Sequence, residues 1–93
     1  MRKIEQQMVD AVKAKATFSS TNTDVVYIGS DDTSKVYLHN NHIGTYTHND
    51  GIFTVNENTL FCWPTNTTKS RLRALGVNVT TSQGVTYLGG NEV

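Results

Sequence analysis

The sequence predicts an α+β domain: an antiparallel β-meander of about five or six short strands with two helices packed on one face. Apolar residues recur with a helical period near the start of the chain and again around residue 70. Between these stretches, short segments rich in β-branched and aromatic residues alternate with turn-forming residues. The chain has 93 residues, which is the size of one domain, so residues 1–93 are expected to form a single unit.

The first helix is predicted over residues 3–15. Ile4, Met8, Ala11 and Val12 are spaced so that they share one helical face. Residues 17–23 then lack a helical period, and Phe18 is the only apolar residue among them. We therefore expect a connection at this point, with Phe18 reaching the core.

The following segments have the composition or the alternation of strands. They are residues 25–29, 35–39, 42–47, 52–55 and 59–63. Asn40 and Asn41 can adopt positive φ, which favours a two-residue type I′ turn between the second and third of these segments. That turn would place His39 opposite His42, with Val36, Leu38 and Ile43 on one face.

A second helix is predicted over residues 68–75. Thr67 precedes it as an N-cap, and Gly76 follows it where a terminating glycine belongs. Residues 77–80 and 85–88 would then form a closing hairpin, followed by a frayed tail from about residue 89. Leu72 and Leu75 are predicted core residues with Trp63 packed beside them, and Cys62 is predicted to be a buried, inert thiol.

Composition narrows the possible functions. Eight Lys and Arg balance eight Asp and Glu, so the large positive charge typical of phosphate-dependent nucleic-acid binding is absent. No apolar stretch is long enough to cross a membrane, and the basic start is not followed by the apolar region of a signal peptide. We expect a cytoplasmic protein with no membrane partner, and the balanced charge disfavours a nucleic-acid partner without excluding local basic patches.

Catalytic and metal-binding patterns are also missing. The sequence contains neither a nucleophile motif nor a phosphate-binding or dinucleotide-binding loop, which argues against an enzyme with a cofactor. His39 and His42 could approach each other across the predicted hairpin, but only His48 and Cys62 could add soft ligands, and nothing places them nearby. We predict no catalytic residues, no metal and no cofactor.

Hydroxyls and cations gather at the predicted start of the second helix, where free N–H groups favour an anion. The candidate binding residues are Trp63, Thr65, Thr67, Thr68, Lys69, Arg71 and Arg73. The alternative interpretation is structural. Thr67 would then only cap the helix, Lys69 and Arg73 would be solvated neighbours, and Arg71 would pair with a carboxylate such as Glu57.

A second candidate surface is the aromatic side of the predicted hairpin. The assumed register places Tyr37, His39, His42 and Tyr46 together on the face opposite the core. Such side chains combine apolar bulk with a polar tip, which suits a binding patch. An ordinary half-exposed sheet would carry the same residues.

Three segments, residues 1–8, 36–43 and 63–75, together resemble a family of small proteins of tailed bacteriophages. The most specific part runs from Trp63 to Leu75, with threonines before a basic residue, an arginine and a leucine. The chain has Asn40, Cys62 and Arg73 where that family usually has glycine, glycine and asparagine. The resemblance implies a phage origin and the α+β fold, so the cytoplasm expected above would be that of the host, but it supplies no catalytic residue.

These observations favour a non-enzymatic phage accessory protein that binds a host protein and inhibits or redirects it. The alternative is a sponge for a host nucleotide signal, with Thr68, Lys69 and Arg71 on phosphate and a tyrosine or Trp63 stacked on a base, or a nucleic-acid-binding module. Self-association, as a dimer, is expected because few Lys or Pro residues guard the strand edges. Residues 45–47 and 77–80 are the predicted pairing segments.

Overall fold

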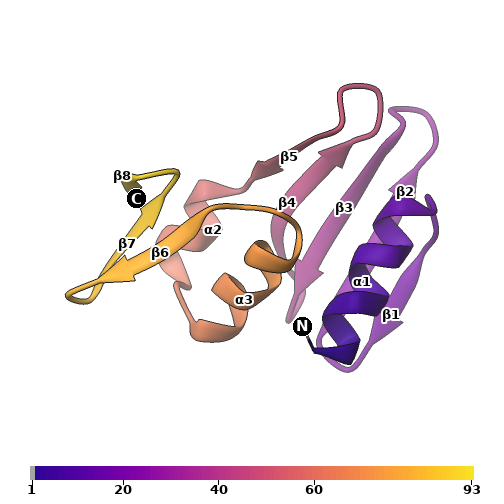
Figure 1. Ribbon diagram of the computed structural model, residues 1–93. Helices are drawn as coiled ribbons and strands as arrows, with labels where there is room; N and C mark the ends of the chain where they lie inside the picture. The colour runs from indigo at the N-terminus through magenta and orange to yellow at the C-terminus, as the bar shows by residue number, and fades with distance from the viewer. Residues whose placement is uncertain (1) are drawn as a thin grey trace.

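The computed structural model describes residues 2–93 and contains three helices and eight strands (Figure 1). In chain order they are α1 (Lys3–Lys13), β1 (Phe18–Ser20), β2 (Thr23–Ile28), β3 (Thr33–Leu38), β4 (Asn41–Thr47), β5 (Ile52–Val55), α2 (Glu57–Cys62), α3 (Asn66–Ala74), β6 (Val79–Ser82), β7 (Val85–Leu88) and β8 (Asn91–Glu92).

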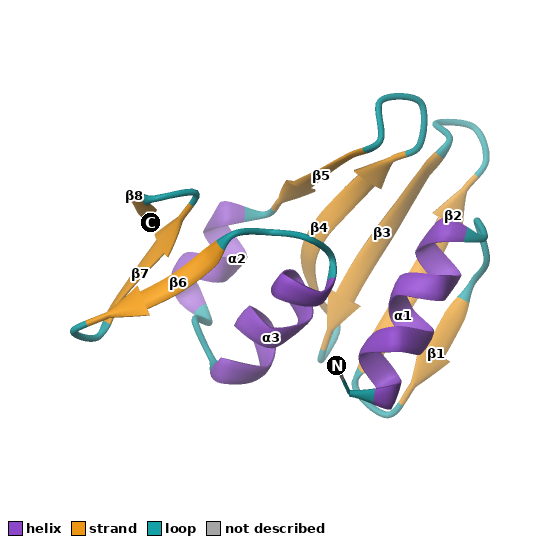
Figure 2. Cartoon of the chain, viewed as in Figure 1, coloured by secondary structure: helices purple, strands orange, loops and turns teal. Residues whose placement is uncertain are grey.

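The strands form two antiparallel sheets rather than the single meander expected. β1 to β5 pair in chain order as a five-stranded sheet, and β6 to β8 form a separate three-stranded sheet. Helices α1 and α3 lie side by side over one face of the larger sheet, while the small sheet projects from the side on which β5 lies (Figure 2). The predicted α+β class is confirmed.

The core lies between the two long helices and the inner face of the large sheet. It contains Met8, Val9, Ala11, Val12, Val25, Val36, Leu38, Ile43, Leu60, Leu72 and Val79. The apolar face predicted for α1 is therefore the buried one, although the helix ends at Lys13, two residues earlier than expected. Phe18 and Leu75 pack against this core as partly buried residues.

The segment predicted as a strand at residues 59–63 is wrong: it belongs to helix α2 and its C-cap. The Asn56 side chain accepts a hydrogen bond from the Thr59 backbone N–H at 3.3 Å, which caps the first turn of the helix. Leu60 is its only buried residue. One inward side chain is sufficient to anchor a six-residue helix, and so short an apolar run does not distinguish a helix from a strand.

The turn between β3 and β4 is displaced by one residue from its predicted position. His39 and Asn40, with φ of 49° and 64°, occupy the two positive-φ positions. Tyr37 therefore pairs with His42, and the register shifts between Val36 and Tyr37, where β4 accommodates an extra residue. The extra residue, Ile43, lies in the core with Val36 and Leu38, so the predicted inner face is correct although the predicted partners are not.

Two further expectations near the chain ends are corrected. The residues after Gly90 are not frayed, because β8 pairs with β7 and the Val93 N–H donates to the Thr86 carbonyl at 3.0 Å. The connection after α1 contains an edge strand, β1, that the polar composition of residues 17–23 did not indicate. Residues 45–47, one of the two segments predicted to pair with a second copy of the chain, belong to β4, which is hydrogen-bonded to a neighbouring strand on both sides.

Candidate functional site

Four successive apolar residues are exposed where α2 ends and turns toward α3. Phe61 is 67% exposed and Trp63 is 56% exposed, and Cys62 and Pro64 between and after them are also exposed. We call residues Phe61, Cys62, Trp63 and Pro64 the apolar corner. It exists because Leu60 anchors α2, Pro64 cannot continue the helix, and the chain leaves the core before it re-enters at Thr68.

This arrangement corrects two expectations. Trp63 does not pack beside Leu72, and Cys62 is an exposed free thiol rather than a buried one. Both predictions assumed that residues 59–63 form a strand within the sheet. Since α2 turns these side chains outward instead, the largest aromatic residue of the protein lies in solvent.

Two hollows flank the apolar corner. One, of about 340 Å³, is bounded by Trp63 and by Leu38, His39, Ile43 and Thr68, among other residues. The other, of about 240 Å³, lies beside Phe61 and Pro64 and reaches Val85 and Val93 in the small sheet. The corner therefore combines protruding aromatic side chains with adjacent recesses, which is how the central residues of protein interfaces are commonly arranged.

The hollow beside Trp63 brings together residues from both surfaces predicted from the sequence. Trp63, Thr65, Thr67 and Thr68 come from the start of α3, and His39 comes from the β3–β4 turn. Thr65, rather than the predicted Thr67, is the N-cap: its Oγ1 accepts from the Thr68 N–H at 3.2 Å. The helix therefore begins two residues earlier than expected.

The cations of α3 are directed away from this hollow. Arg71 is buried, and its guanidinium contacts Glu5 Oε2 at 2.8 Å and donates from Nε to Thr23 Oγ1 at 3.2 Å. Lys69 is also buried, with its Nζ donating to Thr81 Oγ1. The exposed Arg73 donates from Nε to the Val79 carbonyl at 2.8 Å.

Two structural expectations for these cations are therefore wrong. Arg71 pairs with Glu5 rather than with Glu57, and Lys69 is buried rather than solvated. The physical reason is that α3 packs against α1, which brings the Glu5 carboxylate against the Arg71 guanidinium. These three side chains bind elements of the fold together and do not surround the N-terminus of α3.

Burial raises the pKa of Glu5, but hydrogen bonds outweigh that effect and bring it below the ordinary value of the carboxyl group. The Ser70 hydroxyl, the Arg2 backbone N–H and the Arg71 guanidinium all donate to it, and the charge of Arg71 acts in the same direction. Glu5 is thus a buried carboxylate whose ionised form is favoured by contacts from α1 and α3.

The predicted aromatic face of the hairpin is divided by the structure. Tyr37 and His42 are neighbours on the outer face, with ring centroids 5.4 Å apart, and His42 Nε2 lies 2.9 Å from Thr45 Oγ1. Tyr46 instead pairs with Phe53 and packs against the core on the helix side. His39 lies in the turn and is exposed.

One pair with catalytic side-chain types escaped sequence analysis. Ser34 Oγ and His48 Nε2 are 2.8 Å apart, although the two residues are fourteen positions apart and belong to no motif. Ser34 is fully buried and the imidazole lies edge-on to Tyr27 and Tyr46, so no substrate can reach the hydroxyl. Over residues 2–93, no group of three or more His, Cys, Asp or Glu is placed to hold a metal ion.

The fold is that of a small α+β protein that exposes an apolar corner. The chain belongs to the Kyanoviridae Gp96 protein family, which it matches over residues 1–92. This is a phage protein family, which agrees with the phage origin implied by the sequence resemblance. No curated protein and no solved structure matches the chain. Within the described residues, no helix is both long and apolar enough to cross a membrane.

Proposed function

We propose that this phage accessory protein is not an enzyme but binds a host protein through the apolar corner, inhibiting or redirecting it in the host cytoplasm. The observation that carries the proposal is the exposure of Phe61 and Trp63 in one continuous apolar run. Burying either aromatic side chain on association would remove a large apolar area from water.

The surroundings of the corner support a protein partner. Aromatic residues that project beside recesses are frequent energetic centres of interfaces, because partner side chains can fill the recesses while the rings are buried. The hollows beside Trp63 and beside Phe61 lie on the two sides of the α2–α3 connection. One partner surface could therefore engage both.

The test compares capture from host lysate by the wild-type protein and by a Phe61→Ala, Trp63→Ala variant. Binding of the captured host protein is then measured with purified components. Losing two interface centres should weaken binding by at least about 30-fold, since each such residue contributes about 1–2 kcal/mol or more. The matched control is Val26→Ala, Ile52→Ala, which removes exposed apolar residues, 40% and 58% exposed, from the large sheet.

The proposal fails if the corner variant, folded as judged by its circular dichroism spectrum and melting curve, binds the host protein as tightly as the control variant does. A partner that contacts only the outer sheet face would give the opposite order, with the Val26 and Ile52 changes weakening binding. The comparison therefore distinguishes the two surfaces as well as testing for binding.

The second candidate function is sequestration of a nucleotide signal in the hollow beside Trp63. The exposed indole could stack on a base, and Thr65, Thr67 and His39 offer polar groups around it. Lys69 and Arg71 give this proposal no support, because both are engaged within the fold. A nucleotide present at 100 times its dissociation constant would stabilise the protein by about 2.7 kcal/mol, which a thermal-shift assay detects. A nucleic-acid-binding module is the third candidate, testable by titration with labelled oligonucleotides.

A further inference from the structure

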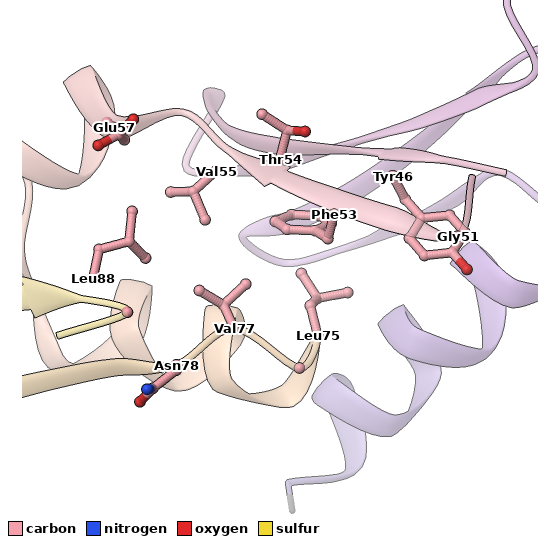
Figure 3. Close-up of a pocket in the computed structure, with 12 residues that line it drawn as sticks. Tyr46, Gly51, Phe53, Thr54, Val55, Glu57, Leu75, Val77, Asn78 and Leu88 are labelled. Atoms are coloured by element: carbon pink, nitrogen blue, oxygen red, sulfur yellow. The ribbon is translucent and has the colours of Figure 1, made fainter. Parts of the chain in front are cut away.

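A groove separate from the apolar corner runs between the large sheet and the chain that follows α3. Its hollow is about 420 Å³. Figure 3 shows Phe53 and Val55 of β5 on one side, and Leu75, Val77 and Leu88 on the other. All five side chains are partly exposed and pack against the core from its margin. The groove therefore has apolar walls that solvent can reach.

The strand β5 presents a free hydrogen-bonding edge at this groove. It is the last strand of the five-stranded sheet and pairs only with β4 (Figure 1). The Asn56 N–H donates to Ile43 on β4 at 2.9 Å. Because alternate residues of an antiparallel strand point their N–H and C=O groups to the same side, Thr54 faces β4, and Phe53 and Val55 face outward.

The hollow reaches the backbone of β5 and not only one of its faces. Phe53, Thr54 and Val55 all border it, although successive side chains of a strand point to opposite faces. The hollow therefore runs along β5, the strand whose outer edge is unpaired. An incoming strand could thus make backbone hydrogen bonds to Phe53 and Val55 while its side chains enter the groove.

The charge of the residues that line the groove indicates which side chains its occupant should carry. Glu57, exposed at the start of α2, lines the same hollow, and no Lys or Arg borders it. Within residues 2–93 no cation lies within ion-pair distance of the Glu57 carboxylate. The hollow therefore has apolar walls, a hydrogen-bonding edge and one negative group without a counter-charge.

We propose that this groove binds an extended peptide segment of a partner protein, added as a strand to β5. The peptide would place apolar side chains between Phe53 and Val77, and a lysine or arginine against Glu57. This mode of recognition draws affinity from backbone hydrogen bonds and specificity from alternate side chains. The site shares no residue with the apolar corner, so this proposal can be tested independently of the function proposed above.

The test is a titration of the ¹⁵N-labelled full-length protein with defined peptides, followed by NMR. The probes are seven-residue peptides that alternate valine and threonine, with a lysine at the first or the last position. Saturable shifts are expected at the amides of Phe53, Val55, Val77 and Leu88. Replacing the lysine of the better peptide with glutamate should weaken binding at least about threefold, the scale of an exposed ion pair.

Protein variants separate the backbone contribution from the side chains. Val55→Pro removes one outward N–H and should weaken binding about tenfold or more, because proline is tolerated at a strand edge but cannot donate there. Val55→Ala, the matched control, keeps the N–H and should bind several-fold better than Val55→Pro. Glu57→Gln should abolish the preference for lysine over glutamate without abolishing binding.

Backbone methylation of the peptide provides a test that does not depend on any variant folding. Methylating the amide nitrogens on one edge of the peptide should eliminate binding when that edge faces β5. The proposal is overturned if no peptide gives saturable shifts at millimolar concentration, or if peptides methylated on either edge bind as well as the parent. It is also overturned if the same amides shift on dilution without peptide, since a second copy of the chain would then occupy the groove.

Discussion

Arg71 shows how one residue can have a different role from the one its sequence context indicates. Its guanidinium lies between α1, α3 and β2, with only 3% of the side chain exposed, and its partner Glu5 is equally inaccessible. Hydrogen bonds from Ser70 and to Thr23 complete the cluster. Such a pair contributes little net stability when intact, but losing one member leaves a buried charge without compensation.

Replacing Arg71 with alanine should therefore destabilise the protein by about 3–5 kcal/mol, the usual cost of breaking a buried ion pair. This is a large fraction of the total stability, roughly 5–14 kcal/mol, that is usual for a domain of this size. Arg73→Ala, which removes an exposed side chain with one hydrogen bond, should cost only about 0.5–1.5 kcal/mol. Urea unfolding of both variants measures the difference.

A double variant tests the cause. In Glu5→Leu, Arg71→Met both charges are removed together, so much of the loss seen with Arg71→Ala should be recovered. Equal costs for Arg71→Ala and Arg73→Ala would show that the buried pair is unimportant. Failure of the double variant to recover stability would assign the loss to packing instead.

Glu5 also predicts a dependence of stability on pH. Its pKa in the folded protein lies below the ordinary value of 4.5, so the folded state binds its proton more weakly than the unfolded chain does. The stabilisation is complete above about pH 4.5 and is lost as the pH falls through the lower pKa of the folded state. Glu5→Gln should be less stable than wild type at pH 7, with the difference shrinking toward pH 3. Urea midpoints at the two pH values measure this, and a constant difference would contradict it.

At the scale of elements, the close approach of β4 and β5 depends on a missing side chain. Gly44 lies on the buried side of β4, and a Cβ there would collide with the Phe53 ring. Its φ is not in the left-handed region, so the requirement is for space rather than for backbone freedom. The glycine lets Phe53 lie across β4 and form the wall of the groove.

Gly44→Ala should consequently destabilise the fold by about 1–3 kcal/mol through overpacking. The change should be partly rescued by Phe53→Leu in the same chain, because the smaller side chain can yield to the added methyl group. Chemical denaturation of the single and double variants measures both effects. Gly29→Ala is the matched control, since an added Cβ there meets only one atom at an ordinary contact distance of 3.7 Å. A Gly44 variant as stable as this control would contradict the prediction.

Elements with a distinct pattern were predicted well, and an element whose composition fits both a helix and a strand was not. The apolar period of α1 and the limits of β5 follow directly from the sequence. Residues 59–63 were wrongly assigned to a strand, because five successive apolar and β-branched residues fit the period of a helix as well as that of a strand. The Asn56 cap that begins the helix is not part of a recognisable sequence motif. Trp63 was misplaced as a consequence of that one error.

The β3–β4 turn shows a different limit. The sequence correctly predicted a turn with positive φ at its two central residues. It placed these residues at Asn40 and Asn41, whereas the structure has them at His39 and Asn40. The extra residue of β4 between His42 and Gly44 moves every later side chain of that strand to the other face, and it separated Tyr46 from Tyr37. The burial of Lys69 and Arg71 was equally unpredictable, since their contacts with Thr81 and Glu5 depend on how distant elements pack.

At the scale of the whole molecule, charge is unevenly distributed although its sum is zero. No Lys or Arg occurs between Lys35 and Lys69, or after Arg73. The only Asp or Glu side chains in residues 41–63 and 79–92 are Asp50, Glu57 and Glu92. Both the apolar corner and the β5 groove lie in this part of the chain. A partner that binds there meets a weakly acidic surface, so basic partner residues would favour encounter and salt would slow it.

Self-association remains a proposal, and the strand edges determine where it could occur. Residues 45–47 are excluded as a pairing segment because β4 is paired on both sides, which leaves the predicted segment 77–80, whose last two residues begin β6. The Val79 carbonyl on the free edge of β6 already accepts from Arg73, so only the outer half of β6, around Thr81, is open to a second copy. We propose that the dimer forms there through an antiparallel pair of β6 strands.

So short a pairing should be weak, and the dimer should therefore appear only at high protein concentration. Sedimentation velocity over a concentration series should show a species larger than the 10.3 kDa monomer that grows with concentration. Arg73→Ala should strengthen it, because the change frees the Val79 carbonyl and lengthens the edge available for pairing. A monomer at every concentration, in wild type and in Arg73→Ala alike, would show that the edge of β6 is adequately protected by the fold and that the protein acts as a single chain.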